Sequence, residues 1–165
     1  MSIGSLSIFY YADLRPDVRI YIKNTIDKLG TYDAVHIRHS DYKTDYKSFL
    51  SEVADLSSDK IALCTDSCEV QRYAKETFSD RFICVNEIPD VGGKTLHGNK
   101  ELDRYKTNLA ALTDLFVLGA AKKLYTTYID SGYDKSKGRR QSGFSKLAIE
   151  LNKRPKLIER ILNGE

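Results

Sequence analysis

The chain contains no tryptophan, only three prolines and only three cysteines among its 165 residues. An odd number of cysteines cannot all pair within one chain, so the cysteines indicate a reducing compartment, and we expect a cytoplasmic protein. No apolar run approaches the roughly 18 residues that would span a bilayer, and no basic segment followed by an apolar run opens the chain. Neither a membrane span nor a classical export signal is expected.

Several motifs with well-defined chemistry are also missing. The sequence has no Gly-x-Gly-x-x-Gly, no P-loop and no Gly-x-Ser-x-Gly, which argues against dinucleotide, P-loop nucleotide and serine hydrolase sites. Cys64 and Cys68 lack the second cysteine pair of a zinc site. His36 and His39 fall on a strand and the loop after it, so they would not share a face. We therefore expect no metal ion and no cofactor.

The charge of the chain is modest overall but uneven. The net charge is +3, whereas residues 132–165 hold nine Lys or Arg and four Asp or Glu, a balance of +5. An anionic ligand would explain this bias, and so would a solvated loop beside a polar helix face. The basic run 135–140 has no interleaved aromatic residues, so a nucleic acid is not the expected partner.

The length and the 41% hydrophobic content predict one folded domain over residues 1–165. Helical spacing of apolar residues alternates with short β-rich runs, which predicts a parallel sheet covered by crossover helices. The expected fold class is α/β, a Rossmann-like three-layer α/β/α arrangement with four to five strands. Strands are expected at 32–38, 60–64, 82–85 and 123–128, and helices at 16–29 within a leading segment 1–30, around 46–53 and 70–78, and at 102–121, 142–152 and 155–162.

Ligands of open parallel sheets bind at the carboxyl ends of the strands. The residues at those ends are Arg38 to Asp41, Thr65 and Asp66, Asn86 and Glu87, and the basic loop 129–141 that leads to Ser142. The planar guanidinium of Arg38 suits a phosphate or carboxylate. The alternative is an arginine paired with a neighbouring carboxylate, Asp41 or Asp66.

Ser142-Gly143-Phe144-Ser145 opens the helix that follows the basic loop. Backbone N–H groups at a helix start, a flexible glycine and two hydroxyls are sufficient for an anion site. The alternative is simple capping of the helix by Ser142. Because Arg38 and this segment belong to the same edge of the sheet, together they predict a phosphate clamp.

Four motifs, in order, resemble those of the fucosyltransferase superfamily that comprises α1,2-, α1,6- and protein O-fucosyltransferases. They cover residues 32–148. Val35-His36-Ile37-Arg38-His39-Ser40-Asp41-Tyr42 resembles the His-x-Arg-Arg-x-Asp-Tyr signature, and Ala62 to Ser67 resembles a strand ending in Thr-Asp-Ser. Asn108 to Leu118 resembles a helix bearing a functional aspartate, Asp114. Ser142 to Ala148 resembles the Ser-x-Phe-Ser-x-Leu-Ala segment.

The resemblance implies the nucleotide-sugar-binding domain of a GT-B glycosyltransferase that inverts the sugar and needs no metal ion. Arg38 would bind the β-phosphate of GDP-fucose, or a related GDP-sugar, and stabilise the departing GDP. Asp114 would bind the guanine edge with His36 beside it. Ser142, Gly143, Phe144 and Ser145 would hold the diphosphate.

Two features depart from the family pattern. His39 stands where the signature has a second arginine, and the segment from Thr127 to Ser142 is longer than expected. Only about 31 residues precede the first strand, so the acceptor-binding domain, or a second chain, would have to be supplied separately. A general base could be Asp41, Asp66 or Glu87, with Thr65 nearby. A non-catalytic nucleotide-sugar-binding domain and an RNA-binding α/β domain are the rival interpretations.

Overall fold

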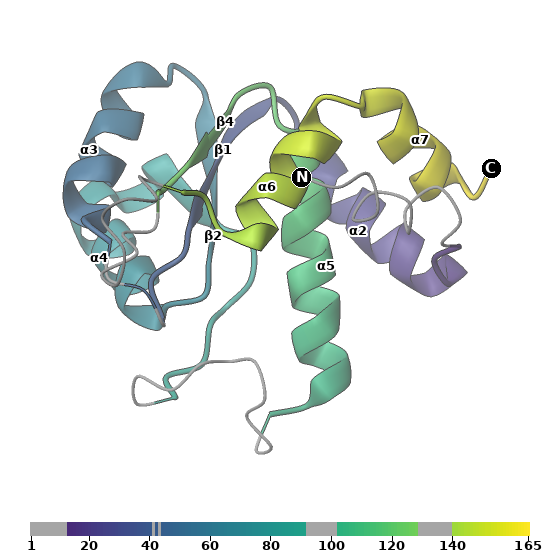
Figure 1. The fold of residues 1–165 in the computed structure, drawn as a ribbon, viewed down its shortest axis with the longest axis horizontal. Coiled ribbons are helices and arrows are strands. Elements are labelled where there is room, and N and C mark those ends of the chain that lie inside the picture. The colour runs from purple at the N-terminus through teal and green to yellow at the C-terminus, as the bar shows by residue number, and fades with distance from the viewer. Residues whose placement is uncertain (1–12, 41, 43, 92–101, 129–139) are drawn as a thin grey trace.

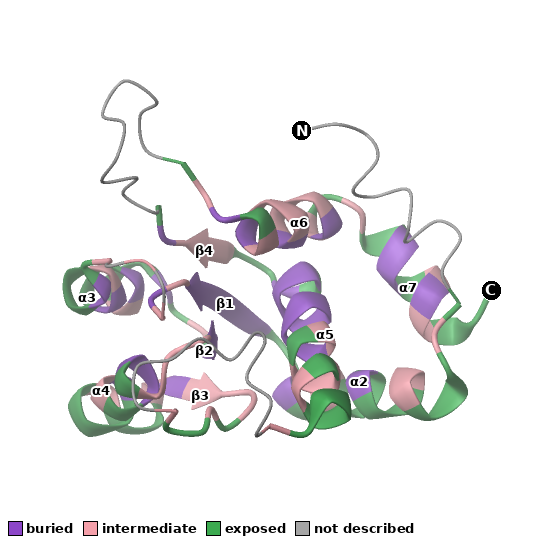
Figure 2. Cartoon of the chain, turned by 60° about the horizontal axis from the view of Figure 1, so that its bottom comes forward, coloured by how far each residue is buried: buried purple, intermediate pink, exposed green. Residues whose placement is uncertain are grey.

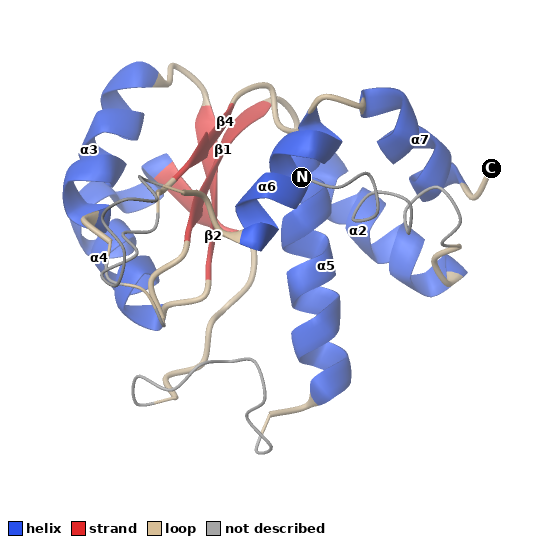
Figure 3. Cartoon of the chain, in the orientation of Figure 1, coloured by secondary structure: helices blue, strands red, loops and turns tan. Residues whose placement is uncertain are grey.

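The computed structural model describes residues 13–40, 42, 44–91, 102–128 and 140–165. Four strands form one parallel sheet in the order β3-β2-β1-β4 (Figure 1). They are β1 (Tyr32–Ile37), β2 (Lys60–Thr65), β3 (Phe82–Cys84) and β4 (Leu124–Thr126). The helices are α2 (Pro16–Leu29), α3 (Tyr46–Leu56), α4 (Cys68–Phe78), α5 (Arg104–Ala120), α6 (Gly143–Asn152) and α7 (Pro155–Asn163), with a short 3₁₀ turn at Ser79–Arg81 (Figure 3).

Short polar side chains define where several helices begin. Asp45, Ser67, Asp103 and Ser142 each accept a hydrogen bond from a backbone N–H in the first turn of α3, α4, α5 and α6. Such caps satisfy N–H groups that have no partner within the helix. Among the described residues, no helix is long and apolar enough to cross a membrane.

The helices form two layers, one on each face of the sheet. One hydrophobic core joins α2, α5, α6 and α7 to Ala34, Ala62 and Cys64 of the sheet. A second core joins α3 and α4 to the alternate strand residues, including Val35 and Leu63. Figure 2 shows β1 buried along its length, as expected for an inner strand covered on both faces. The fold is therefore a Rossmann-like α/β/α sandwich.

The strand order contains one reversal of direction. From β1 the chain moves outward through α3 to β2 and through α4 to β3, and it then returns along α5 to β4 on the other side of β1. The reversal of the strand order therefore lies between β1 and β4. Ligands of this fold class bind at such a reversal.

Sequence and structure agree closely on the elements. The helix predicted at 16–29 is α2, and the final segment is helical, as expected. The fourth strand is shorter than predicted because only Leu124–Thr126 pairs with β1, at the edge of the sheet. Backbone pairing continues just beyond it, where Thr127 donates its N–H to the carbonyl of His36. Of the basic loop 129–141, only Arg140 and Gln141 lie within the described residues.

Candidate functional site

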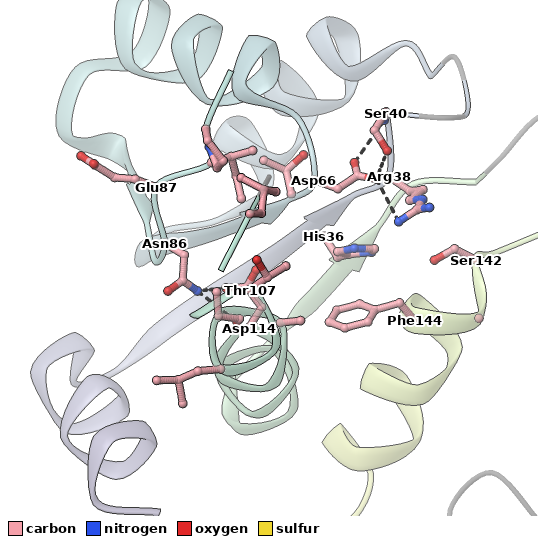
Figure 4. Close-up of a pocket in the computed structure, with 18 of the residues that line it drawn as sticks. His36, Arg38, Ser40, Asp66, Asn86, Glu87, Thr107, Asp114, Ser142 and Phe144 are labelled. Carbon is pink, nitrogen blue, oxygen red and sulfur yellow. Dashed lines mark hydrogen bonds and ion pairs between the residues drawn. The ribbon is translucent and has the colours of Figure 1, made fainter. Parts of the chain in front are cut away.

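A cleft of about 1110 Å³ lies at the carboxyl edge of the sheet. Its lining comes from the ends of β1, β2 and β3, from one face of α5 and from the start of α6 (Figure 4). Residues singled out from the sequence line it, namely His36, Arg38, Ser40, Thr65, Asp66, Asn86, Glu87, Asp114, Ser142, Gly143 and Phe144. The fold thus brings together residues from five separate segments of the chain.

Arg38 follows β1 and is held in place by Asp66, which follows β2. Nη1 of Arg38 lies 2.9 Å from Oδ2 of Asp66. Oδ1 of Asp66 accepts the backbone N–H groups of His39 and Ser40 at 2.9 and 3.2 Å, and Oδ2 also accepts the Ser40 hydroxyl. Asp66 therefore fixes the loop that carries Arg38, and the ion pair considered from the sequence is present. The Arg38 side chain remains 28% exposed and lines the cleft.

The start of α6 forms the wall opposite Asp66. Ser142 caps the helix, since its Oγ accepts the N–H of Ser145 at 3.0 Å. The first two helical residues, Gly143 and Phe144, have N–H groups with no acceptor inside the helix, and both residues line the cleft. A helix N-terminus in this position attracts anions through its N–H groups and its dipole. Capping and anion binding are compatible here because they use different N–H groups.

His36 points from β1 toward α6. Its Nδ1 lies 2.8 Å from Oγ of Ser145, and its ring packs on Phe144 with 5.0 Å between the centroids. Burial lowers the pKa of His36 to about 4; Asp66 raises this pKa and Arg38 lowers it further. The imidazole is consequently neutral at physiological pH.

Asp114 occupies the opposite end of the cleft, on α5. Its Oδ1 accepts a hydrogen bond from Nδ2 of Asn86 at 2.6 Å. Burial raises the pKa of Asp114 to about 7, against the lowering effect of the hydrogen bonds from Asn86 and Cys64. A carboxyl group with a strongly shifted pKa in a cleft is typical of a functional position.

Charged residues of both signs line the cleft. Arg38, Arg140 and Lys146 lie toward α6, where Asp66 pairs with Arg38, whereas Glu87, Asp103 and Asp114 lie toward β3 and α5, where Lys106 also lines the cleft. Figure 4 shows Arg38 and Ser142 on one side, with Asn86 and Glu87 on the other. Because β3 and β4 are the outer strands of a four-stranded sheet, about 14 Å separates them at the usual spacing of neighbouring strands. An elongated ligand with an anionic end and a hydrogen-bond-donating end would match this layout.

The remaining predicted residues have different surroundings. Ser145 does not line the cleft; it is fully buried behind Ser142. The hydroxyl of Thr65 donates to the carbonyl of Ile37 at 2.8 Å, which ties β2 to β1. Glu87 is exposed at the rim. Asp41 lies outside the described residues.

Sequence reasoning predicted Asp114 of α5 and the start of α6 but missed other residues on the helices. Lys106 and Thr107 of α5 and Tyr21 of α2 extend the cleft beyond the sheet. Gln71 of α4 is buried and holds the segment after β3, donating to the carbonyl of Asn86 at 2.6 Å and accepting from the N–H of Ile88 at 3.1 Å. The available signal was a glutamine on the apolar face of a helix, next to Val70.

The histidine, cysteine and acidic side chains form no metal site in the part of the chain that the structure describes. No group of three or more such side chains that could hold a metal ion is found among those residues. His36 faces α6 and His39 contacts Tyr46 of α3, so the two side chains point into different layers, as the sequence predicted. Cys64, Cys68 and Cys84 are free thiols.

Comparisons with protein-family models, with curated proteins and with solved structures found no match for this chain. The function must therefore be argued from the cleft itself.

Proposed function

We propose that the cleft binds GDP-fucose or a related GDP-sugar, and that the chain is a fucosyltransferase-like domain that transfers the sugar with inversion to an acceptor. The observation that carries this proposal is the arrangement along one cleft of Arg38 and the start of α6 at one end and Asp114 at the other, at the strand reversal of a Rossmann-like sheet. The motif resemblance described above supports the choice of ligand. No metal ion has a role in the proposal.

The end of the cleft at Asp114 suits a guanine base. The Watson–Crick edge of guanine presents two adjacent N–H donors, and a carboxylate is an acceptor with two oxygens. Asp114 provides that carboxylate, and Asn86 holds one of its oxygens at 2.6 Å. Adenine and uracil present no such pair of donors, so Asp114 would favour guanine over both.

The end of the cleft at Arg38 and α6 suits the diphosphate. Arg38 offers a charged, planar donor group, and the start of α6 adds the N–H groups of Gly143 and Phe144. Negative charge builds on the leaving diphosphate during glycosyl transfer, so donors fixed around it lower the barrier at the step where the charge develops. Asp66 fixes Arg38 before the ligand arrives, which reduces the reorganisation needed in the transition state.

A non-catalytic nucleotide-sugar-binding domain is the second candidate function, and one observation favours it. The carboxylate of Asp66 already accepts hydrogen bonds from His39, Ser40 and Arg38. A general base must be available to the acceptor hydroxyl, and Asp66 is not. Glu87 is exposed at the cleft rim and is the described carboxylate that remains open to this role.

Calorimetric titration of the purified chain with GDP, GDP-fucose, ADP and UDP tests the proposal. We expect the two guanine nucleotides to bind and the other two to bind at least about tenfold more weakly, because each unsatisfied buried donor or acceptor costs about 1–3 kcal/mol. Equal binding of all four, or binding of none, would refute it. Release of fucose, or its transfer to an added acceptor, would then separate the enzyme from the binding domain.

A further inference from the structure

Three side chains form a continuous hydrogen-bonded chain behind the wall of the cleft. Nδ1 of His36 lies 2.8 Å from Oγ of Ser145, and Oγ of Ser145 lies 2.9 Å from Oγ of Ser142. Ser145 is fully buried, whereas His36 and Ser142 are 5% and 8% exposed and both line the cleft. The two ends of the chain therefore reach the cleft, and its middle does not.

The number of protons in this chain limits what its ends can do. Ser142 Oγ already accepts the N–H of Ser145 at 3.0 Å. If the Ser142 hydroxyl donates to Ser145, then Ser145 donates to Nδ1 of His36, and the ring proton sits on Nε2. If the Ser142 hydroxyl turns toward the cleft, Ser145 donates to Ser142, and Nδ1 of His36 must carry the proton. While His36 is neutral, these three hydrogen-bonded side chains therefore present one donor proton to the cleft. It lies either on Nε2 of His36 or on Oγ of Ser142.

The distances fit both arrangements, since either serine oxygen can be the donor. We expect the first arrangement in the free protein, because Oγ of Ser145 is the acceptor that the described residues provide for the Ser142 hydroxyl. An anionic oxygen at the start of α6 changes the balance, because charge-assisted hydrogen bonds are about twice as strong as neutral ones. Such an oxygen draws the Ser142 hydroxyl toward itself.

We infer that Ser142, Ser145 and His36 act as a relay in which an anionic oxygen bound at Ser142 converts Nε2 of His36 from a hydrogen-bond donor into an acceptor. This inference rests on the proposed binding of a diphosphate at α6. The relay also specifies the ligand further. Beside its anionic oxygen, the ligand carries a hydroxyl or N–H group that donates a hydrogen bond to Nε2. A sugar linked to a diphosphate meets both requirements.

The neutral state that the relay needs is consistent with its surroundings. Burial disfavours the imidazolium form of His36, whose pKa is about 4. Arg38 disfavours it too, and Asp66 opposes both effects. The other charged groups that line the same cleft are Glu87, Asp103, Lys106, Asp114, Arg140 and Lys146.

Nitrogen-15 NMR of the histidine rings in the whole chain tests the relay, with the His36 signals assigned by the His36→Gln variant. At pH 7.5, roughly a pH unit above the usual histidine pKa, we expect Nε2–H in the free protein and Nδ1–H with saturating GDP. The Ser145→Ala variant should show a mixture of the two tautomers in the free protein and no switch with GDP. Ser51→Ala, which removes an exposed hydroxyl of α3 that does not line the cleft, should still switch.

The outcomes separate the relay from the proposed function. If calorimetry shows GDP binding while His36 keeps its proton on Nε2, the relay is wrong and the function stands. If GDP does not bind, the proposed function is wrong. The histidine spectra of the free proteins then still test whether the three side chains are coupled. A single tautomer in the wild type and a mixture in Ser145→Ala support the relay, whereas identical spectra overturn it.

Discussion

Asp114 of α5 and Asn86, which follows β3, meet at one end of the cleft, with Nδ2 of Asn86 donating to Oδ1 of Asp114 at 2.6 Å. The same Nδ2 donates to the carbonyl of Ala110 at 3.1 Å, one turn earlier on α5. Asn86 therefore locks one oxygen of the carboxyl group. The Asp114 carboxyl group is therefore an acceptor held in a fixed orientation. Its charge depends on pH near neutrality, because burial raises its pKa to about 7.

GDP affinity should rise with pH through about 7 in the wild type. The ionised carboxylate accepts two N–H donors of guanine, whereas the protonated form offers one acceptor fewer. Asp114→Asn should weaken GDP binding by about tenfold to a hundredfold at pH 8, the range for a hydrogen bond to a charged group. Titrations between pH 6 and 8 measure both effects. Any change of GDP affinity with pH that Asp114→Asn retains belongs to the phosphate. An equal change with pH in the wild type and the variant would contradict the role of Asp114.

Two buried groups should make opposite contributions to the pH dependence of stability. The folded state raises the pKa of Asp114 from 3.8 to about 7, so its contribution is lost as pH rises through that window. The folded state lowers the pKa of His36 from 6.5 to about 4, so its contribution is lost as pH falls through that window. Each effect is on the order of a few kcal/mol, and in the wild type they largely cancel.

Urea unfolding of single variants between pH 4 and 8 separates these two contributions. Asp114→Asn should become more stable relative to the wild type as pH rises, and His36→Gln should become more stable relative to the wild type as pH falls. Parallel curves for all three proteins would show that neither group titrates differently on folding.

Arg38→Ala should weaken GDP binding by about 2–3 kcal/mol, or roughly 30- to 150-fold, as the loss of one charged donor does elsewhere. Arg72→Ala is a matched control, because Arg72 pairs with Asp90 at 3.6 Å, is 62% exposed and does not line the cleft. Calorimetry with both variants measures the difference. Equal losses of GDP affinity in the two variants would mean that the overall positive charge of the protein, rather than the position of the Arg38 guanidinium, attracts the ligand.

Two helical glycines should respond to alanine in opposite ways. A methyl group on Gly143 meets no heavy atom within 4 Å, whereas one on Gly119 lies 3.0 Å from Cδ1 of Ile158 and 3.1 Å from Cβ of Leu151. Gly143→Ala should keep or improve stability, by up to about 1 kcal/mol, and should weaken GDP binding because the methyl group enters the cleft.

Gly119→Ala should lose about 1–3 kcal/mol of stability, as overpacked cores do, and should bind GDP normally while folded. Thermal unfolding and calorimetry of both variants check the contrast. Unchanged GDP affinity in Gly143→Ala would place the ligand away from the start of α6.

Sequence patterns predicted the fold well where periodicity and caps act locally. Pro16 begins α2 and Gly30 follows its last residue, as expected, and the buried β-rich runs form β1 and β2. The residues after the strands were predicted to meet, because the carboxyl ends of parallel strands share one edge. Arg38, Asp66 and Glu87 do line one cleft.

Other parts of the site depend on tertiary packing that no local pattern encodes. Tyr21 reaches the cleft because α2 packs along α5, and a surface tyrosine on a helix carries no such signal. The raised pKa of Asp114 follows from its burial, which is set by neighbours distant in sequence. The bond between His36 and Ser145 likewise depends on how α6 sits against the end of β1.

That bond joins residues 109 positions apart, so the cleft is built from distant parts of the chain. Arg38 follows the first strand of the sheet, whereas the start of α6 is held beside it by the pairing of β4 with β1 and by the packing of α6 in the core. Closing so long a loop carries an entropic cost. A ligand that touches both Arg38 and the start of α6 would brace this junction, adding about 2.7 kcal/mol of stability at a hundred times its Kd. Occupancy of the cleft would therefore stabilise the packing of α6 against the sheet.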